Sequence, residues 1–197
     1  TLTPGREEAG IPSRWRKGDD WQGYLEHLLV RLHKQRTGLE RSEKAADPTR
    51  PCIDTSGNYH VVTDIYDVHN YEQNPAAFAE HYANLSDGGK HTDHCGRRQK
   101  YDGRLPFFVS EYGGIRWTED KSGWGYGDAP KTEEEFLTRL EGLTDVLLSN
   151  PRMFAYCYTQ LTDVEQEQNG LYTYDRRPKF PAETIRAILS KKAAVED

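Results

Sequence analysis

A carboxylate follows a short apolar run near the middle of the chain, and these residues are the first candidates for chemistry. The run Phe107–Val109 consists of β-favouring residues, and Glu111, Gly113 and Gly114 follow closely. Such a run is typical of a strand buried in a parallel sheet, and α/β enzymes place reactive side chains at the carboxyl ends of such strands. The glycines allow a sharp turn or the close approach of a ligand. Glu111 is therefore a candidate catalytic residue, although a cap or ion pair at the strand end explains the local pattern equally well.

Two further polar side chains, His69 and Tyr71, lie at the end of a second strand-like segment, residues 63–71. Side chains two residues apart in a strand point to the same face. His69 is thus a candidate ligand contact, but a single histidine in a strand is as often structural.

A third group of residues consists of possible metal ligands, but their spacing does not match a typical metal site. His91, His94 and Cys95 are close in sequence, with His81 nearby. Zinc accepts such ligands, but structural zinc sites normally combine two well-spaced Cys/His pairs, and the second pair is lacking here. We therefore predict no metal site and no cofactor.

Strands and helices are predicted to alternate along the chain. Four short apolar segments bounded by turn residues are predicted as strands, namely residues 52–54, 63–71, 105–109 and 153–158. Helices are predicted from the spacing of apolar residues and from capping and proline signals: residues 21–44, ended by Asp47-Pro48; residues 76–85; a helix capped by Thr132 and Glu135 that ends near Asn150; and a last helix opened by Pro181. Residues 86–104 are predicted as a long loop.

This alternation predicts an α/β fold with parallel strands. Four βα units amount to half of a (β/α)₈ barrel, which typically needs about 250 residues. The expected organisation is an irregular segment over residues 1–20, the half-barrel over 21–192 and a tail over 193–197.

Composition limits the class of protein. The 197 residues carry a formal charge of −6 and a mean hydropathy of −0.91, with no apolar run long enough for a membrane span and no apparent signal peptide. No basic patch indicates a nucleic-acid partner. Cys52 and Cys157 lie in predicted strands, where a buried free thiol is expected. Nothing in the sequence indicates a compartment.

Four segments, taken together, resemble a known family. Residues 46–51 (ADPTRP), 63–71 (TDIYDVHNY), 108–114 (FVSEYGG) and 155–171 (AYCYTQLTDVEQEQNGL) are similar, in order and spacing, to the last four strand units of the catalytic barrel of glycoside hydrolase family 2. This family contains β-galactosidases, β-glucuronidases and β-mannosidases. The resemblance runs from about residue 47 to 179 and implies strands 5–8 of the barrel.

The resemblance implies a retaining mechanism with two carboxylates. Glu111 matches the family nucleophile, which would form a glycosyl-enzyme ester. Tyr71 matches a tyrosine that hydrogen-bonds this carboxylate, and His69 would contact a sugar hydroxyl. Tyr112 would either help position the carboxylate or pack in the core.

At the eighth strand the sequence departs from the family. Members usually carry a tryptophan that forms the floor of the sugar pocket, whereas this chain has Tyr158 and Gln160, either of which could take that place. Because of this departure, the sequence does not identify which sugar is bound.

The family's general acid/base, which lies in an Asn-Glu pair, has no counterpart in this sequence. General acid assistance contributes about 10²–10⁴-fold, so we expect a β-galactosidase-like fragment that is nearly inactive alone. A non-catalytic carbohydrate-binding module or scaffold remnant is the alternative. Half a barrel leaves strand edges unpaired, so a homodimer through those edges is also expected.

Overall fold

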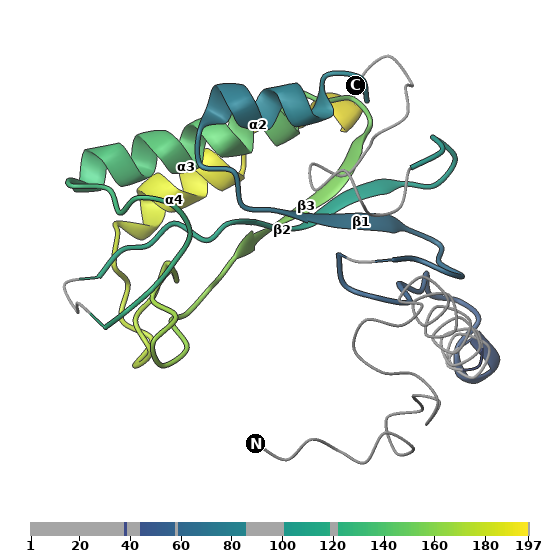
Figure 1. Ribbon diagram of the computed structural model, residues 1–197, viewed down its shortest axis with the longest axis horizontal. Coiled ribbons are helices and arrows are strands. Elements are labelled where there is room, and N and C mark those ends of the chain that lie inside the picture. The colour runs from purple at the N-terminus through teal and green to yellow at the C-terminus, as the bar shows by residue number, and fades with distance from the viewer. Residues whose placement is uncertain (1–37, 39–43, 58, 86–100, 119–121, 197) are drawn as a thin grey trace, which may run out of the picture.

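The computed structural model describes residues 38, 44–57, 59–85, 101–118 and 122–196. Three strands, β1 (Tyr66–Asn70), β2 (Phe107–Gly113) and β3 (Met153–Thr159), form one sheet in the order β1-β2-β3. Both pairs are parallel, as Figure 1 shows. The predicted α/β class with parallel strands is confirmed, and the arrangement is compatible with part of a barrel.

The predicted strand at residues 52–54 is wrong, because this segment belongs to an irregular loop. The Asp54 carboxylate accepts the backbone N–H groups of Val61 and Val62. Cys52 and Asp64 are joined in both directions, by Asp64 N–H to the Cys52 carbonyl at 2.9 Å and by Cys52 N–H to Asp64 Oδ2 at 2.8 Å. Aspartate side chains thus satisfy backbone groups that a strand would pair with a neighbouring strand.

Three α-helices follow the three strands in turn: α2 (Pro75–Tyr82) after β1, α3 (Glu133–Leu148) after β2, and α4 (Ala182–Leu189) after β3. A 3-10 turn, η1 (Ala194–Glu196), lies in the predicted tail. Thr132 caps α3 by accepting Glu135 N–H at 3.1 Å, as predicted. The Glu135 carboxylate accepts Lys131 N–H instead of the expected Thr132 N–H. Pro181 stands just before α4 rather than at its first position.

Several predictions fall mainly outside the described residues. These are the irregular segment 1–20, most of the helix over 21–44, most of the loop 86–104, and the residues His91, His94 and Cys95. The described residues 44–46 are helical, and the helix ends before Asp47-Pro48 as predicted. No helix in the described part of the chain is long and apolar enough to cross a membrane.

The helices α2, α3 and α4 lie on the same face of the sheet (Figure 1). The core forms between this face and the helices, with alternate strand residues meeting one stripe of α3. Its most buried members include Phe78, Phe107, Val109, Tyr112, Ile115, Phe136, Leu140, Leu143 and Leu147.

Side chains on the edge strand β3 are less covered. Phe154 is 53% exposed and Cys157 is also exposed, whereas Cys52 is half-buried. Burial of the Cys157 thiol was therefore a wrong prediction. In the described residues β3 has a single strand neighbour, β2.

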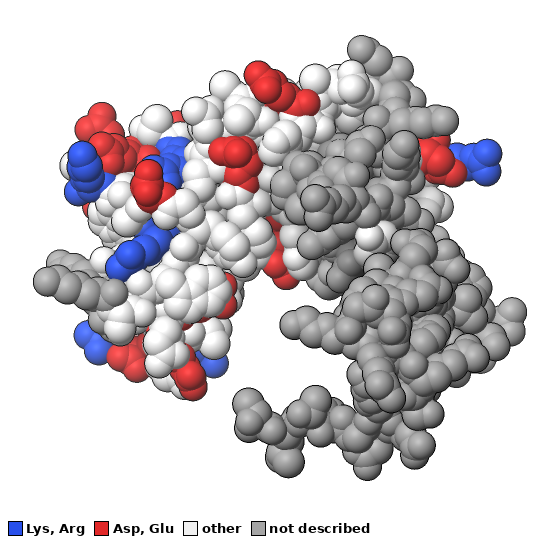
Figure 2. All heavy atoms as spheres, in the orientation of Figure 1, with Lys and Arg blue, Asp and Glu red and all other residues white. Residues whose placement is uncertain are grey.

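Acidic and basic side chains are interspersed over the face in Figure 2. Beyond the end of α4, Lys191 donates to Glu141 and Asp145 of α3 at 2.7 Å each. Such surface pairs contribute little to stability individually. Lys191 therefore neutralises part of the negative charge of Glu141 and Asp145.

The Leu143→Ala substitution tests the proposed core. Leu143 is fully buried in α3, so its truncation should lower the free energy of unfolding by about 2–5 kcal/mol. The matched control is Leu137→Ala in the same helix. Leu137 is only partly buried, so its truncation should cost roughly 1 kcal/mol. Urea unfolding measures both changes, and equal losses would contradict the placement of Leu143 in the core.

Candidate active site at the carboxyl end of the sheet

A β-bulge in β2 sets the direction of the candidate carboxylate. Val68 pairs with Val109, but the next residue of β1, His69, pairs with Glu111, so Ser110 is an extra residue. An extra residue re-aims the side chains that follow it. Val109 and Tyr112 both lie in the core, whereas the side chains of Ser110 and Glu111 contact the opposite face of β1. The bulge therefore turns two consecutive residues, Ser110 and Glu111, away from the helices.

Two side chains from the end of β1 meet the Glu111 carboxylate. The Tyr71 hydroxyl donates a short hydrogen bond to Oε2, and Nδ1 of His69 lies 3.2 Å from the same oxygen. Burial raises the pKa of Tyr71 above its ordinary value, and the hydrogen bond to Glu111 raises it further. The phenol therefore stays protonated and remains a donor to the carboxylate. Both contacts use Oε2, so among the described residues Oε1 is the oxygen available to a ligand.

The Tyr71 ring is fixed by stacking. It lies parallel to the Tyr126 ring, with centroids 3.5 Å apart and an interplanar angle of 7°. Both rings pass close to Gly114, where φ is +58° and a Cβ would overlap the Tyr126 ring. Glycine is therefore required for the packing that orients the Tyr71 hydroxyl.

The other ring nitrogen of His69 is also engaged. Nε2 lies 2.8 Å from the Ser56 hydroxyl, in the loop that precedes β1. The next residue, Gly57, has a φ of +57°, and a Cβ there would overlap the His69 ring. The loop therefore packs directly against His69.

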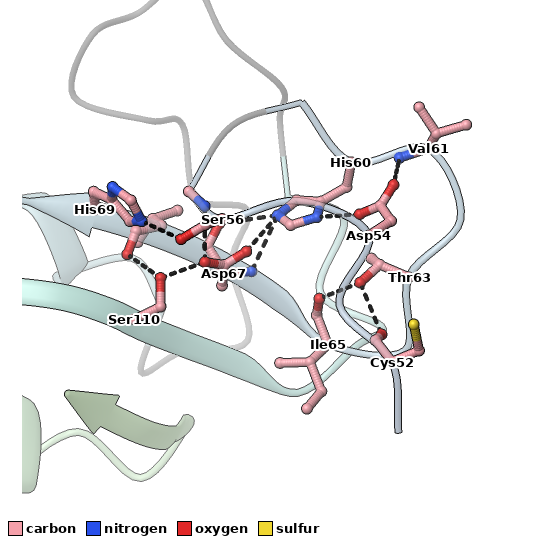
Figure 3. A network of polar contacts seen from close by, with 12 residues as sticks. Cys52, Asp54, Ser56, His60, Val61, Thr63, Ile65, Asp67, His69 and Ser110 are labelled. Atoms are coloured by element: carbon pink, nitrogen blue, oxygen red, sulfur yellow. Dashed lines mark hydrogen bonds and ion pairs between the residues drawn. The ribbon is translucent and has the colours of Figure 1, made fainter. Parts of the chain in front are cut away.

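A buried ionic cluster holds this loop against β1 (Figure 3). Nδ1 of His60 lies 2.8 Å from Asp54, and Nε2 lies 3.1 Å from Asp67 Oδ1; the three side chains are only 1–2% exposed. Asp67 Oδ2 accepts the Gly57 N–H at 2.8 Å and a short hydrogen bond from Ser110. The cluster thus links the loop, β1 and the bulge of β2.

The charges in this cluster support one another. Burial alone would lower the pKa of His60, but its contacts with Asp67 and Asp54 outweigh burial and raise that pKa. Burial alone would raise the pKa of Asp67, but hydrogen bonds from His60, Ser110 and Gly57 outweigh it, so that pKa lies below its usual value. The two ring nitrogens of His60 thus face the two carboxylates, and Nε2 also lies within hydrogen-bond distance of the Asp67 backbone.

The hydroxyl or amide groups of the remaining predicted site residues have other partners. Tyr112 is fully buried and its hydroxyl lies 2.8 Å from Thr144 of α3, which favours packing over contact with a ligand. The Tyr158 hydroxyl donates to the Asn169 carbonyl at 3.1 Å, and Gln160 Nε2 donates weakly to the Glu167 carbonyl at 3.4 Å. Both support the loop after β3. The structure therefore brings together Glu111, Tyr71 and His69, and it does not bring Tyr112 to them.

Sequence reasoning missed Ser56, Asp54, His60, Asp67 and Ser110. The only available signal was that Asp67 and His69 alternate on one face of the strand. The loop residues gave none, because their contacts depend on how the chain folds back.

An open groove of about 930 Å³ adjoins Tyr71. It runs between the loop from β1 to α2 and the first turns of α3, and its lining includes Gln73, Arg139 and Glu135. Arg139 donates to the Asp128 carbonyl at 2.8 Å and to Gln73 at 3.3 Å, so its guanidinium serves to join the two walls. Three or more metal-binding side chains do not gather anywhere in the described residues.

This chain was compared with protein-family models, with curated proteins and with solved structures. Comparison with protein-family models gave no match, and neither did comparison with curated proteins. Solved structures do match. A GH2 β-galacturonidase from Eisenbergiella tayi shares 15% identity at a TM-score of 0.56, over 82% of this chain and 30% of its own. Bacteroides uniformis β-glucuronidase 2 shares 21% identity at a TM-score of 0.58, over 83% of this chain and 20% of its own.

The fold is that of a segment of glycoside hydrolase family 2 enzymes. A further Bacteroides uniformis β-glucuronidase structure agrees, with 21% identity and a TM-score of 0.55 over 84% of this chain. The resemblance drawn from the four sequence segments is thus confirmed at the level of the fold. This chain spans 20–30% of the length of these structures.

The pH dependence of stability tests the ionic cluster. The raised pKa of His60 adds stability that is complete below its unfolded value of 6.5 and is lost as the pH rises through the folded value. The lowered pKa of Asp67 adds stability that is present above its unfolded value of 3.8 and is lost as the pH falls through the folded value. The cluster should therefore be most stabilising between these two unfolded values.

The histidine part can be measured in two ways. Titration of the His60 ring by NMR should give a pKa above 6.5. Urea unfolding should show stability falling with rising pH more steeply in the unchanged protein than in His60→Asn. A His60 pKa below 6.5 would contradict the charged cluster.

Proposed function

We propose that the chain carries the nucleophile half of a retaining β-glycoside hydrolase site, with Glu111 as the nucleophile. The observation that carries the proposal is the convergence of the Tyr71 hydroxyl and His69 Nδ1 on one oxygen of Glu111. These two contacts hold one oxygen and orient the carboxylate. A charged carboxylate with one oxygen held and the other available suits attack on an anomeric carbon.

In the proposed reaction, Oε1 of Glu111 bonds to the anomeric carbon as the glycosidic bond breaks. The leaving group departs with the bonding electrons, and the sugar remains as an ester on Glu111. Water then attacks the same carbon, releases the sugar and restores the carboxylate. Throughout, Tyr71 donates to Oε2 and holds the carboxylate in one orientation.

The proton donor for the leaving group is not assigned to this chain. Nearby carboxylates have other partners: Asp163 pairs with Lys179 at 2.7 Å, and Glu72 accepts the N–H groups of Gln73 and Asn74. Without general acid assistance, natural glycosides should react about 10²–10⁴-fold more slowly. Aryl glycosides with good leaving groups need little assistance, so they are the proposed substrates for the isolated chain.

The sugar is proposed as a class rather than one compound. The sequence resemblance suggests a β-galactosidase-like activity, whereas the structural neighbours are a β-galacturonidase and β-glucuronidases. One neighbour is covalently bound to cyclophellitol-6-carboxylate aziridine. Probes should therefore cover neutral and carboxylated sugars.

Trapping with 2,4-dinitrophenyl 2-deoxy-2-fluoro-β-glycosides tests the proposal. The panel contains the galactoside, glucoside, mannoside, glucuronide and galacturonide. At least one probe should add a single fluoroglycosyl group, and peptide mass spectrometry should place it on Glu111. Glu111→Gln should abolish labelling, whereas Glu165→Gln, in the exposed loop after β3, should not change it. Sugar binding without labelling, or a label on another residue, would support a non-catalytic role instead.

Tyr71→Phe should slow the labelling of Glu111. The substitution removes a hydrogen bond to a charged group, worth about 1.5–3 kcal/mol, so the rate constant should fall about 10–100-fold. Tyr174→Phe is the matched control, because Tyr174 is 67% exposed. Unchanged labelling in Tyr71→Phe would remove Tyr71 from the proposed site.

A further inference from the structure

His69 lies between an acceptor and a hydroxyl, and this arrangement limits where its proton can be. Nδ1 faces Glu111 Oε2 at 3.2 Å, and Nε2 faces the Ser56 hydroxyl at 2.8 Å. A carboxylate can only accept hydrogen bonds, whereas a serine hydroxyl can donate or accept. The two neighbours of the ring therefore have different requirements.

Only one neutral tautomer satisfies both neighbours. With the proton on Nδ1, the ring donates to Glu111 and Nε2 accepts from Ser56. With the proton on Nε2, the ring donates to Ser56 and the lone pair of Nδ1 faces the carboxylate, which is repulsive. The Glu111 carboxylate thus decides which nitrogen carries the proton, and the Ser56 hydroxyl can then donate to the other nitrogen.

We propose that Ser56 is a positioning residue: its hydroxyl donates to Nε2 and so stabilises the His69 tautomer whose Nδ1 proton faces the Glu111 carboxylate. This inference rests on the proposed role of Glu111 and adds a residue from the loop before β1. Ser56 does not contact the reacting atoms in the proposed reaction. It acts through His69.

The loop is built to hold Ser56 in place. On one side of Ser56, Asp54 is fixed by His60 and by the backbone of Val61 and Val62. On the other side, Gly57 N–H donates to Asp67 Oδ2 at 2.8 Å, and the absence of a Cβ lets the loop lie against the His69 ring. Figure 3 shows these contacts running from Asp54 through His60 and Asp67 to Ser56 and His69. The buried cluster therefore serves a purpose at the site: it presents one hydroxyl to Nε2.

The same arrangement gives the two oxygens of Glu111 different roles: Oε2 is held by neighbouring side chains, and Oε1 is proposed to attack. Tyr71 donates to Oε2 and His69 Nδ1 lies 3.2 Å from the same oxygen, so neither occupies the oxygen proposed to attack. Loss of the Ser56 donor should affect the orientation of the carboxylate, and hence the maximal rate of labelling, more than the binding of the probe.

Nitrogen NMR of the histidine rings tests the tautomer directly, whether or not the protein reacts with sugars. In the unchanged protein near neutral pH, His69 should show a protonated Nδ1 and an unprotonated Nε2. Ser56 is exposed, so Ser56→Ala should fold, and it should shift the nitrogen resonance of His69 Nε2, which loses its hydrogen-bond donor. Ser56→Thr keeps the hydroxyl and should restore the original pattern. The control is Ser190→Ala, which replaces an exposed serine at the end of α4. It should leave the nitrogen resonances of His69 unchanged.

The labelling kinetics supply the second measurement. Ser56→Ala should lower the maximal labelling rate constant about three- to tenfold, the equilibrium factor expected for one hydrogen bond, with little change in the concentration for half-maximal rate. Ser56→Thr should recover most of that rate. A His69 ring protonated on Nε2 in the unchanged protein, or doubly protonated, would overturn the inference, as would equal behaviour of Ser56→Ala and Ser190→Ala. Failure of the unchanged protein to label at Glu111 would instead count against the proposed function, and the NMR result would still decide the tautomer.

Discussion

The extra residue Ser110 in β2 is the feature on which the candidate site depends. Without it, strict alternation after Val109 would point Glu111 toward the helices, because successive side chains of a strand face opposite ways. With it, Glu111 lies beside His69 and Tyr71, while Tyr112 fills the core and contacts Thr144 of α3. One strand can thus supply both a packed core and a polar rim within four residues.

The bulge is stabilised by the ionic cluster beside it. The Ser110 hydroxyl, which faces away from the helices, donates to Asp67, and Asp67 is in turn paired with His60. Buried ionic groups are costly unless they have partners, and here the Gly57 N–H and the Ser110 hydroxyl both donate to Asp67 Oδ2, whereas Oδ1 has no hydrogen-bond partner in the described residues. The cluster that carries this desolvation cost also joins three segments: the loop before β1, β1 itself and the bulge of β2. We infer that its value is positional: it fixes the geometry of the loop and the strands relative to Glu111.

The sequence predicted those parts of the fold that depend on local patterns. The apolar run at Phe107, the cap at Thr132 and the spacing of leucines in α3 each reflect interactions within a few residues, and each prediction was confirmed. The segment at Cys52 was misjudged because its aspartates bind backbone groups 7–12 residues away, which no local pattern reveals.

Prediction of the site followed the same rule. Glu111 and His69 lie near the carboxyl ends of their strands and Tyr71 directly follows one. All three were recognised through the family resemblance, and the structure brings them together. The positions of Tyr112 and Ser56 were not predictable, since one depends on the register of a bulge and the other on a loop that folds back. A bulge leaves little trace in composition, because Ser110 and Glu111 would read the same in a regular strand.

The central claim is that the carboxylate of Glu111 attacks the anomeric carbon. The most direct measurement is the anomeric configuration of the product that Glu111→Ala forms from a 2,4-dinitrophenyl β-glycoside in the presence of sodium azide, read by proton NMR. If Glu111 is the nucleophile, azide should enter the space left by the carboxylate, attack the same face and give the α-glycosyl azide. Formation of the β-glycosyl azide, or aryl release that does not depend on azide, would contradict the account.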